Sequence, residues 1–210
     1  MIENITIDPK DAVIEELTDI IERRDNTKAG HSTRVKNAMK IFLEAVIASG
    51  LYKEQTSSWD VEQIVLSSLL HDVGKGGIDD MILRKPGKLD PVEFDVVKRH
   101  TLIGGEIIKE TQDKTDKSKK SEFLNDAFSI AMYHHEKWDG AGYPKGLAGE
   151  EIPLFARLMA IIDVYDALVS EKPYKKPFTH EEAKKIIGEA KGTSFDPDLT
   201  DIFLSIADKL

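Results

Sequence analysis

Apolar residues recur three and four positions apart along most of the chain, which is the period of an amphipathic α-helix. The first such stretch follows Asp8 and Pro9, a cap and first-turn pair, and we predict that this helix ends near Arg24. Further helices are predicted from His31 to Gly50, from Ser58 or Asp60 to His71-Asp72, from Asp90 through His100, from Phe123 to His134, from Pro153 to Val169, from Thr179 to Ala190, and from Asp196 to the end. No stretch alternates with period two and no repeat or linker divides the sequence, so we expect one all-α domain over residues 1–210.

Two stretches interrupt the helical pattern. Residues 111–122 are almost wholly polar and charged, which predicts a surface loop. Residues 139–153 contain four Gly and two Pro, which predicts an irregular loop. Gly104 and Gly105 leave open how far the helix continues beyond His100.

Composition narrows the class of protein. The 210 residues include no Cys, which excludes a disulfide-stapled scaffold and a Cys-ligated zinc or iron–sulfur module. Acidic residues outnumber basic ones by 38 to 29, a net charge of −9, which argues against a nucleic-acid duplex as partner but leaves open a small anionic ligand. No apolar run reaches the length of a membrane span and the N-terminus lacks a secretory signal, so we expect a cytoplasmic protein with no membrane partner.

The histidines gather where predicted helices start or end. The sequence has six of them, at His31, His71, His100, His134, His135 and His180. Neighbouring residues of a helix point about 100° apart, so the pairs His71-Asp72 and His134-His135 each serve one site only at a helix end or between two metal ions. A carboxylate such as Asp72 can bridge two cations, and His with carboxylate ligands suits Fe, Mn, Ni or Zn better than Mg alone. The alternative is a set of unrelated, hydrogen-bonded histidines.

Two carboxylates fall within the apolar helix predicted after Pro153. Asp163 has apolar neighbours three and four residues away, and an unpaired carboxylate there would be costly, so we expect it to meet a cation. Asp166 is expected to be structural, as a capping or ion-paired residue.

These residues resemble a known family. His31, His71-Asp72 and Asp163 look like the H…HD…D signature of the HD-domain metal-dependent phosphohydrolases, which are helical. Residues 134–144, HHEKWDGAGYP, resemble the HHExxxGxGYP motif of the HD-GYP subfamily. The resemblance extends from about Asp8 to Leu204 and implies a single helical HD-domain bundle.

The resemblance implies a phosphodiesterase of the bacterial second messenger cyclic di-GMP, with a cluster of metal ions. By similarity, one ion is held by His31, His71, Asp72 and Asp163, and a second by His100, His134 and His135, with Asp72 as the bridge. Lys75 is expected to contact the scissile phosphate. Gly142, Tyr143 and Pro144 are expected to approach the guanine or the sugar.

The sequence departs from the family pattern at several positions. Family members with a third metal carry Glu four residues before the first His, where this chain has Thr27, so we expect a binuclear centre of Fe or Mn, with Ni or Zn as alternatives. Lys172 and Lys175 stand where the family usually has Arg, and we expect them to meet a phosphate as point charges. The polar stretch at 111–122 is somewhat longer than usual, and a solvated loop is favoured over an anion site. No regulatory domain is visible, so either a regulatory protein acts in trans or the chain is a fragment.

The primary hypothesis is hydrolysis of cyclic di-GMP by a metal-bridging hydroxide, with Asp72 and Lys75 as catalytic residues. Because Thr27 should deny a third metal, we expect linear pGpG to accumulate, although a second cut would give GMP. The alternatives are an HD phosphohydrolase acting on pGpG or on another cyclic dinucleotide, and a non-catalytic cyclic-dinucleotide receptor. Complete metal ligands count against the receptor, and a structural helical module is the remaining alternative.

Overall fold

The computed structural model describes residues 9–25, 30–114, 121–171 and 176–210, and within these ranges it contains helices and turns but no β-strand. The predicted all-α class is confirmed. The α-helices are α1 (Pro9–Asp25), α2 (His31–Ser49), α3 (Lys53–Thr56), α4 (Val61–Ser68), α5 (Asp80–Leu83), α6 (Pro91–Lys98), α7 (His100–Lys114), α8 (Glu122–Tyr133), α9 (Leu154–Val169), α10 (His180–Glu189) and α11 (Pro197–Ile206). Short 3₁₀ helices are η1 (Val73–Gly77), η2 (Gly149–Glu151) and η3 (Ala207–Lys209).

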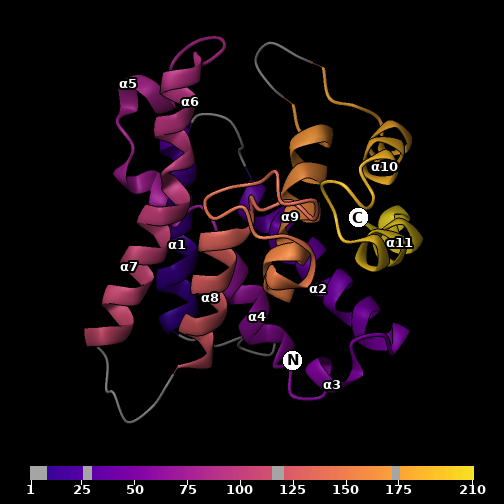
Figure 1. Cartoon of the computed structure of the whole chain (residues 1–210). Helices are drawn as coiled ribbons and strands as arrows, with labels where there is room; N and C mark the ends of the chain where they lie inside the picture. The colour runs from indigo at the N-terminus through magenta and orange to yellow at the C-terminus, as the bar shows by residue number, and fades with distance from the viewer. Residues whose placement is uncertain (1–8, 26–29, 115–120, 172–175) are drawn as a thin grey trace, which may run out of the picture.

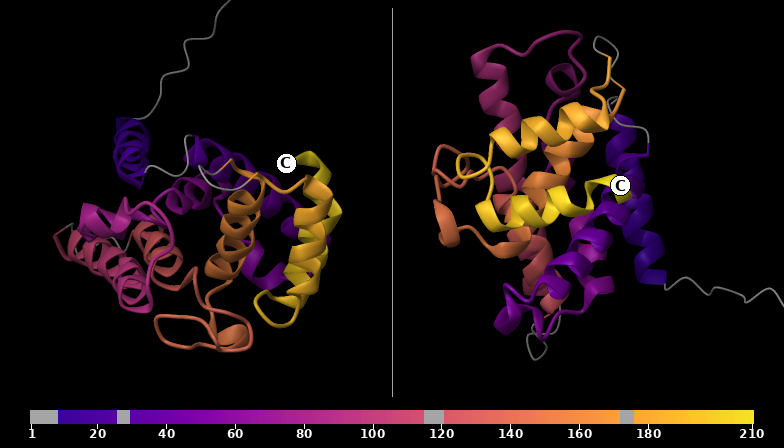
Figure 2. Two further views of the ribbon diagram at one scale, coloured as in Figure 1. Left: turned by 90° about the horizontal axis from the view of Figure 1, so that it is seen from above. Right: turned by 90° about the vertical axis from the view of Figure 1, so that its right-hand side faces the viewer.

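The helices form a bundle in which their order across the molecule differs from their order along the sequence. In Figure 1, α1, α6 and α7 lie on one side, α10 and α11 lie on the other, and α2, α4, α8 and α9 stand between them. The view from above in Figure 2 shows the same order, with α1 and the last two helices at opposite edges. The central helices therefore combine segments that are far apart in the sequence.

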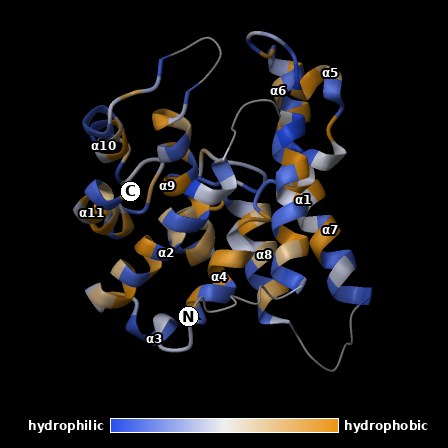
Figure 3. Cartoon of the chain, turned by 180° about the vertical axis from the view of Figure 1, so that it is seen from behind, coloured by the Kyte–Doolittle hydropathy of each residue, from blue (hydrophilic) through white to orange (hydrophobic). Residues whose placement is uncertain are grey.

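The main core is built by the apolar faces that the sequence predicts. Phe42, Leu158, Ile161, Leu199 and Phe203 are fully buried in one cluster contributed by α2, α9 and α11. The hydropathy colouring of Figure 3 shows both apolar and polar residues on most helices, as expected for amphipathic helices that cover a core. Burial of these faces is the dominant favourable contribution to folding.

Most helix ends lie where the sequence predicts them. The Asp90–Glu93 and Thr179–Glu182 capping boxes are both formed, and Gly50 ends α2 with a left-handed φ of 69°. The predicted cap at Asp8 lies outside the described residues.

One predicted helix end near the histidines is wrong, and the structure answers one question that the sequence left open. Helix α4 ends at Ser68, before His71-Asp72, and a run of turns leads into η1. The glycines at 104 and 105 do not interrupt α7, because their missing Cβ atoms allow close helix packing. A Cβ at Gly105 would lie 2.4 Å from Met132 Cε on α8.

The predicted surface loop at residues 111–122 is also partly wrong. Thr111–Lys114 continue α7, and Glu122 is the first residue of α8. An exposed helical turn can consist of polar residues. The ion pair between Lys114 and Glu110, four residues apart on α7, supports the helix there. Residues 115–120 lie outside the described ranges. The irregular loop predicted over residues 139–153 is confirmed, apart from the single turn η2.

None of the helices in the described ranges combines the length and the apolar character needed to span a bilayer.

Candidate metal centre

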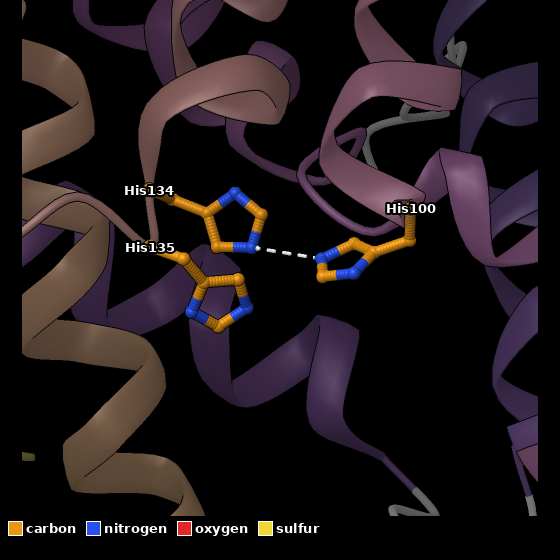
Figure 4. A group of neighbouring side chains, drawn as sticks. All are labelled: His100, His134 and His135. Atoms are coloured by element: carbon orange, nitrogen blue, oxygen red, sulfur yellow. Dashed lines mark hydrogen bonds between the residues drawn. The ribbon is translucent and has the colours of Figure 1, made fainter. Parts of the chain in front are cut away.

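Six predicted site residues converge where several helix ends meet. His31 is the first residue of α2 and His100 the first residue of α7, whereas His134 and His135 follow the end of α8. The turn after α4 supplies His71 and Asp72. Helix ends solve the problem that adjacent residues pose within a helix, because the chain there turns and both members of a pair can point inward. Figure 4 shows His100 facing His134 and His135 across the site.

The imidazole rings are held by hydrogen bonds from their Nδ1 atoms. Nδ1 of His71 donates to the Ser68 carbonyl at 2.9 Å, that of His100 to the Val97 carbonyl at 2.7 Å, and that of His134 to the Ile130 carbonyl at 2.9 Å. A carbonyl oxygen can only accept, so in each neutral ring the proton is on Nδ1 and Nε2 is an acceptor. This arrangement is typical of metal-binding histidines.

The Nε2 atoms approach one another closely. Nε2 of His31 lies 3.2 Å from Nε2 of His71, and Nε2 of His100 lies 3.5 Å from Nε2 of His134, the contact dashed in Figure 4. Two nitrogens bound to one ion at about 2.1 Å, at angles of 90° to 109°, lie about 3.0–3.4 Å apart. Two acceptors at this distance repel unless a cation or proton lies between them, so the spacing fits a shared metal ion.

Asp72 lies between two groups of potential ligands. Its Oδ2 is 3.3 Å from His71 Nε2, whereas its Oδ1 is 3.4 Å from His100 Nε2 and 4.0 Å from His134 Nε2. The potential ligand atoms of His31, His71 and Asp72 lie within 4.8 Å of one another, as do those of His100, His134 and His135. Each carboxylate oxygen thus faces a different group, which is the geometry that a bridge between two cations requires.

The protonation states suit cation binding. Burial lowers the pKa of His100, lowers that of His134 strongly, and lowers the pKa of His135 to about 4. These rings are therefore neutral near pH 7 and can offer lone pairs. Burial by itself would raise the pKa of Asp72, but the nearby charges of Lys75 and His71 outweigh it and hold that pKa well below its usual range.

Asp166 forms a hydrogen bond with Nδ1 of His31, on the opposite side of the ring from Nε2. Its Oδ2 accepts from His31 Nδ1 at 2.7 Å, and the Arg34 guanidinium donates to its Oδ1 at 2.5 Å. Burial by itself would raise the pKa of Asp166. The hydrogen bonds from His31 and Arg34 outweigh this effect and lower the pKa to about 2, so the carboxylate is ionised. The expected ion pair is therefore present. Sequence analysis did not predict that Asp166 also fixes the ring orientation of His31, because the two residues are 135 positions apart.

Asp163 lies at the same site, three residues before Asp166 on α9. Its Oδ1 is 4.0 Å from His31 Nε2, and its side chain is 14% exposed. This position is consistent with the expectation that Asp163 meets a cation.

Lys75 and Tyr143 border the two histidine groups. The Lys75 ammonium is 2.8 Å from Asp72 Oδ2, and the Tyr143 ring stacks on His135 with ring centres 4.8 Å apart. Gly142 serves the loop itself, since a Cβ there would lie 2.3 Å from the Lys137 nitrogen. The close approach that requires glycine is thus to the loop's own backbone.

Glu136 organises the loop that carries Tyr143, a role that sequence analysis did not assign. Its buried carboxylate accepts from the backbone nitrogens of Lys145 at 2.6 Å and Leu147 at 3.1 Å. The feature of the sequence that pointed to Glu136 was its position directly after His135. The carboxylate ties the far side of the loop to the end of α8, and the Tyr143-Pro144 peptide bond within the loop is cis.

Three predicted residues, Thr27, Lys172 and Lys175, lie outside the described residues. His180 is away from the histidine groups, and its Nδ1 contacts the Tyr165 hydroxyl at 2.6 Å.

A small cavity borders the centre on the side of α1. The cavity, of about 20 Å³, is lined in part by Thr18, Glu22 and His71, and it has room for a water molecule but not for a nucleotide. The partly exposed members of the site are Asp72 and Lys75, which also line this cavity, together with His135, Tyr143 and Asp163.

Comparison with known proteins identifies the family of this chain. The family model described as HD domain matches residues 15–199. A protein of Vibrio cholerae named cyclic di-GMP phosphodiesterase is 43% identical over 200 residues, which cover 95% of this chain and 40% of that protein. Another, named 3′3′-cGAMP-specific phosphodiesterase 2, is 36% identical over 204 residues, covering 96% of this chain and 36% of its own length.

A solved structure shares the fold. The crystal structure of a cyclic GMP-AMP specific phosphodiesterase of Vibrio cholerae superposes with a TM-score of 0.61 and 17% identity, over 94% of this chain and 48% of that one. The chain spans 44%, 40% and 48% of the length of three curated relatives that it matches. It belongs to the HD domain family and, with its HHEKWDGAGYP motif and these relatives, to the HD-GYP group within it.

Proposed function

We propose that the chain is a metal-dependent phosphodiesterase that hydrolyses cyclic di-GMP to linear pGpG. The observation that carries the proposal is the convergence of two sets of imidazole Nε2 atoms on opposite oxygens of Asp72. HD-family membership and relatives named cyclic di-GMP phosphodiesterases support the reaction and the substrate.

The donor set fits two divalent transition metal ions, Fe or Mn, with Ni or Zn as alternatives. One ion would be held by His31, His71, Asp72 and Asp163, and the other by His100, His134, His135 and Asp72. Such ions supply Lewis acidity and lower the pKa of water. Accumulation of pGpG rather than GMP follows from Thr27, a neutral residue where a third ion would need a carboxylate.

The residues of the chain would position the phosphodiester and offset its charge. The Lys75 ammonium lies at the edge of the site, where it can donate to a phosphoryl oxygen and stabilise negative charge that develops on the departing 3′ oxygen. Asp72 contributes a carboxylate that stays ionised at neutral pH, while burial keeps His100, His134 and His135 neutral. Lys172 and Lys175 remain proposed phosphate contacts, and a regulatory protein remains a proposed partner.

The test is a chromatogram of cyclic di-GMP incubated with purified protein, loaded anaerobically with Fe(II) or separately with Mn(II). We expect pGpG from the wild type and none from Asp72→Ala, while Asp201→Ala, which removes an exposed carboxylate on α11, retains activity. Circular dichroism checks that all three proteins stay helical. Hydrolysis by a folded Asp72→Ala protein would refute the proposed site.

A second candidate is hydrolysis of a mixed cyclic dinucleotide, which the 36% identity to a relative named for 3′3′-cGAMP favours. Competition between the two cyclic dinucleotides in one reaction distinguishes the candidates, because the preferred substrate is consumed first. The receptor alternative predicts saturable binding of the nucleotide without product with either metal.

A further inference from the structure

A basic and aromatic surface extends from the metal centre along the loop to the end of α6. The Tyr143 ring stacks on His135, and the Lys98 ammonium lies 5.8 Å from the centre of that ring. The same ammonium lies 5.3 Å from the ring centre of Phe94, one turn earlier on α6. His135, Tyr143, Lys98 and Phe94 thus form a continuous series of contacts that leads away from the histidines.

The outer members of this series are open to a ligand. Phe94 is 48% exposed, so part of its ring is accessible to a ligand. Lys98 pairs with Asp95 at 2.5 Å, but the Asp95 side chain is 69% exposed, and such surface pairs contribute little stability. Lys98 can therefore exchange Asp95 for a ligand at small cost.

We propose that Phe94 and Lys98 form a subsite for a guanine base of the substrate. The inference rests on the proposed function, because the phosphodiester at the metal centre would direct one nucleoside along this surface. The Phe94 ring offers a stacking face, and aromatic rings bind bases of single-stranded nucleotides in this way. The Lys98 ammonium would meet the edge of the stacked base.

Lys98 makes the subsite selective for guanine. Guanine presents O6 and N7 as two neighbouring acceptors, which an ammonium can meet with two donors. Adenine presents an N6 amino group at the corresponding position, so an ammonium there faces another donor. The Tyr143 ring borders the same space, with its centre 5.8 Å from the Lys98 ammonium.

The experiment combines kinetics with direct binding. Phe94→Ala and Lys98→Met are compared with Val92→Ala, an exposed apolar truncation on the same helix, and with Lys109→Met, an exposed charge removal on α7. Each Mn(II)-loaded protein is assayed with cyclic di-GMP, cyclic di-AMP and bis(p-nitrophenyl) phosphate, which has no base. Binding is measured by calorimetry with non-hydrolysable phosphorothioate analogues of the two cyclic dinucleotides.

We expect Phe94→Ala to weaken binding of the cyclic di-GMP analogue and raise KM about tenfold. Lys98→Met should lower the preference for guanine over adenine about tenfold, with bis(p-nitrophenyl) phosphate turnover unchanged. Effects no larger than those of the two controls would overturn the subsite, and so would an equal loss on all substrates, since that would indicate damage to the metal centre.

The outcomes separate the two proposals. Binding of the cyclic di-GMP analogue by a wild type that hydrolyses no cyclic dinucleotide would refute the proposed function alone, and the variants would still test the subsite by affinity. A wild type that binds neither analogue would refute both proposals.

Discussion

Asp166 shows how a single buried carboxylate can control a ligand that lies far away in the sequence. It accepts from His31 Nδ1 and is itself held by Arg34 and by its own burial on α9. This fixes both the orientation of the His31 ring and the nitrogen that carries its proton. The remaining nitrogen then faces His71 Nε2.

Replacing Asp166 should therefore weaken metal binding. We expect Asp166→Ala to reduce the affinity for Mn(II) or Zn(II) about 10- to 100-fold, as is typical when the group that orients a ligating histidine is lost. Asp166→Asn, which keeps an acceptor oxygen but not the charge, should lie between this variant and the wild type. The measurement is competition with a chromogenic chelator, with Asp201→Asn as the surface control. Equal affinities in all four proteins would contradict the orienting role.

At the scale of elements, the centre depends on how closely η1 approaches α7. A Cβ at Gly74 would lie 1.9 Å from the His100 carbonyl oxygen and 2.4 Å from the Gly104 nitrogen, whereas nothing lies within 4 Å of a Cβ at Gly76. Only glycine allows the segment after Asp72 to lie against the start of α7. This contact sets the distance from Asp72 to His100.

Gly74→Ala should push the two elements apart. We expect it to lower the free energy of unfolding by about 3 kcal/mol, near the upper end for overpacking, and to reduce the affinity of the His100 group for metal. Gly76→Ala, two residues later in the same 3₁₀ helix, should leave both unchanged within error. Denaturant unfolding and chelator competition measure the two effects, and a Gly74→Ala protein as stable as Gly76→Ala would contradict the packing argument.

The loop over residues 139–153 depends on Glu136 in a similar way. Without its carboxylate, the backbone nitrogens of Lys145 and Leu147 lose their acceptor, at a cost of about 1–3 kcal/mol. We expect Glu136→Ala to raise KM for cyclic di-GMP several-fold through displacement of Tyr143, while metal affinity changes little. Glu150→Ala, an exposed carboxylate of the same loop, is the matched control in steady-state kinetics. A rise in KM of the same size in both variants would show that Glu136 has no special role.

At the scale of the whole molecule, a buried ion pair connects the loop and the C-terminal helices to the core. Arg157 on α9 donates to Asp196 Oδ2 at 2.7 Å, and Asp196 also caps α11 and accepts from the Tyr52 hydroxyl at 3.2 Å. Two backbone bonds join the loop to the same region, from Trp138 to Ser194 and from Asp139 to Thr193. These bonds anchor the start of the loop to the segment that precedes α11.

Removal of Asp196 leaves the Arg157 charge buried and without its carboxylate. We expect Asp196→Ala to destabilise the protein by about 3–5 kcal/mol and to lower Tm by about 10 °C, because breaking a buried pair exposes the full desolvation cost of the other ion. Asp198→Ala, an exposed carboxylate in the first turn of α11, should shift Tm by a degree or two at most, since surface substitutions change stability by about 0.5 kcal/mol. Calorimetric melting curves of both variants test this prediction. Equal shifts in Tm would contradict it, because they would show that the effect comes from the helix terminus and not from the buried ion pair.

Local pattern was sufficient wherever the structure depends on neighbours in sequence. The helical class, the capping boxes at Asp90 and Thr179 and the irregular loop after Asp139 all follow from periodicity and turn chemistry, and all are present. Local pattern left the course of α7 through Gly104 open, and it was wrong for the helical Thr111–Lys114. A glycine weakens an isolated helix, but in α7 it allows a close approach that compensates.

The sequence by itself determined the types of chemical group available, some of the helix ends that present them and the family to which they belong, because motif and periodicity are properties of adjacent residues. Only the tertiary structure decided that the Nε2 atoms of His31 and His71 lie 3.2 Å apart and that each oxygen of Asp72 faces a different histidine group. Those distances depend on how α2, α7, α8 and α9 pack. That packing also brings Asp166 to His31 and Lys98 to Tyr143. It is driven by burial of apolar faces, and the separation of two residues along the chain does not indicate whether this burial brings them into contact.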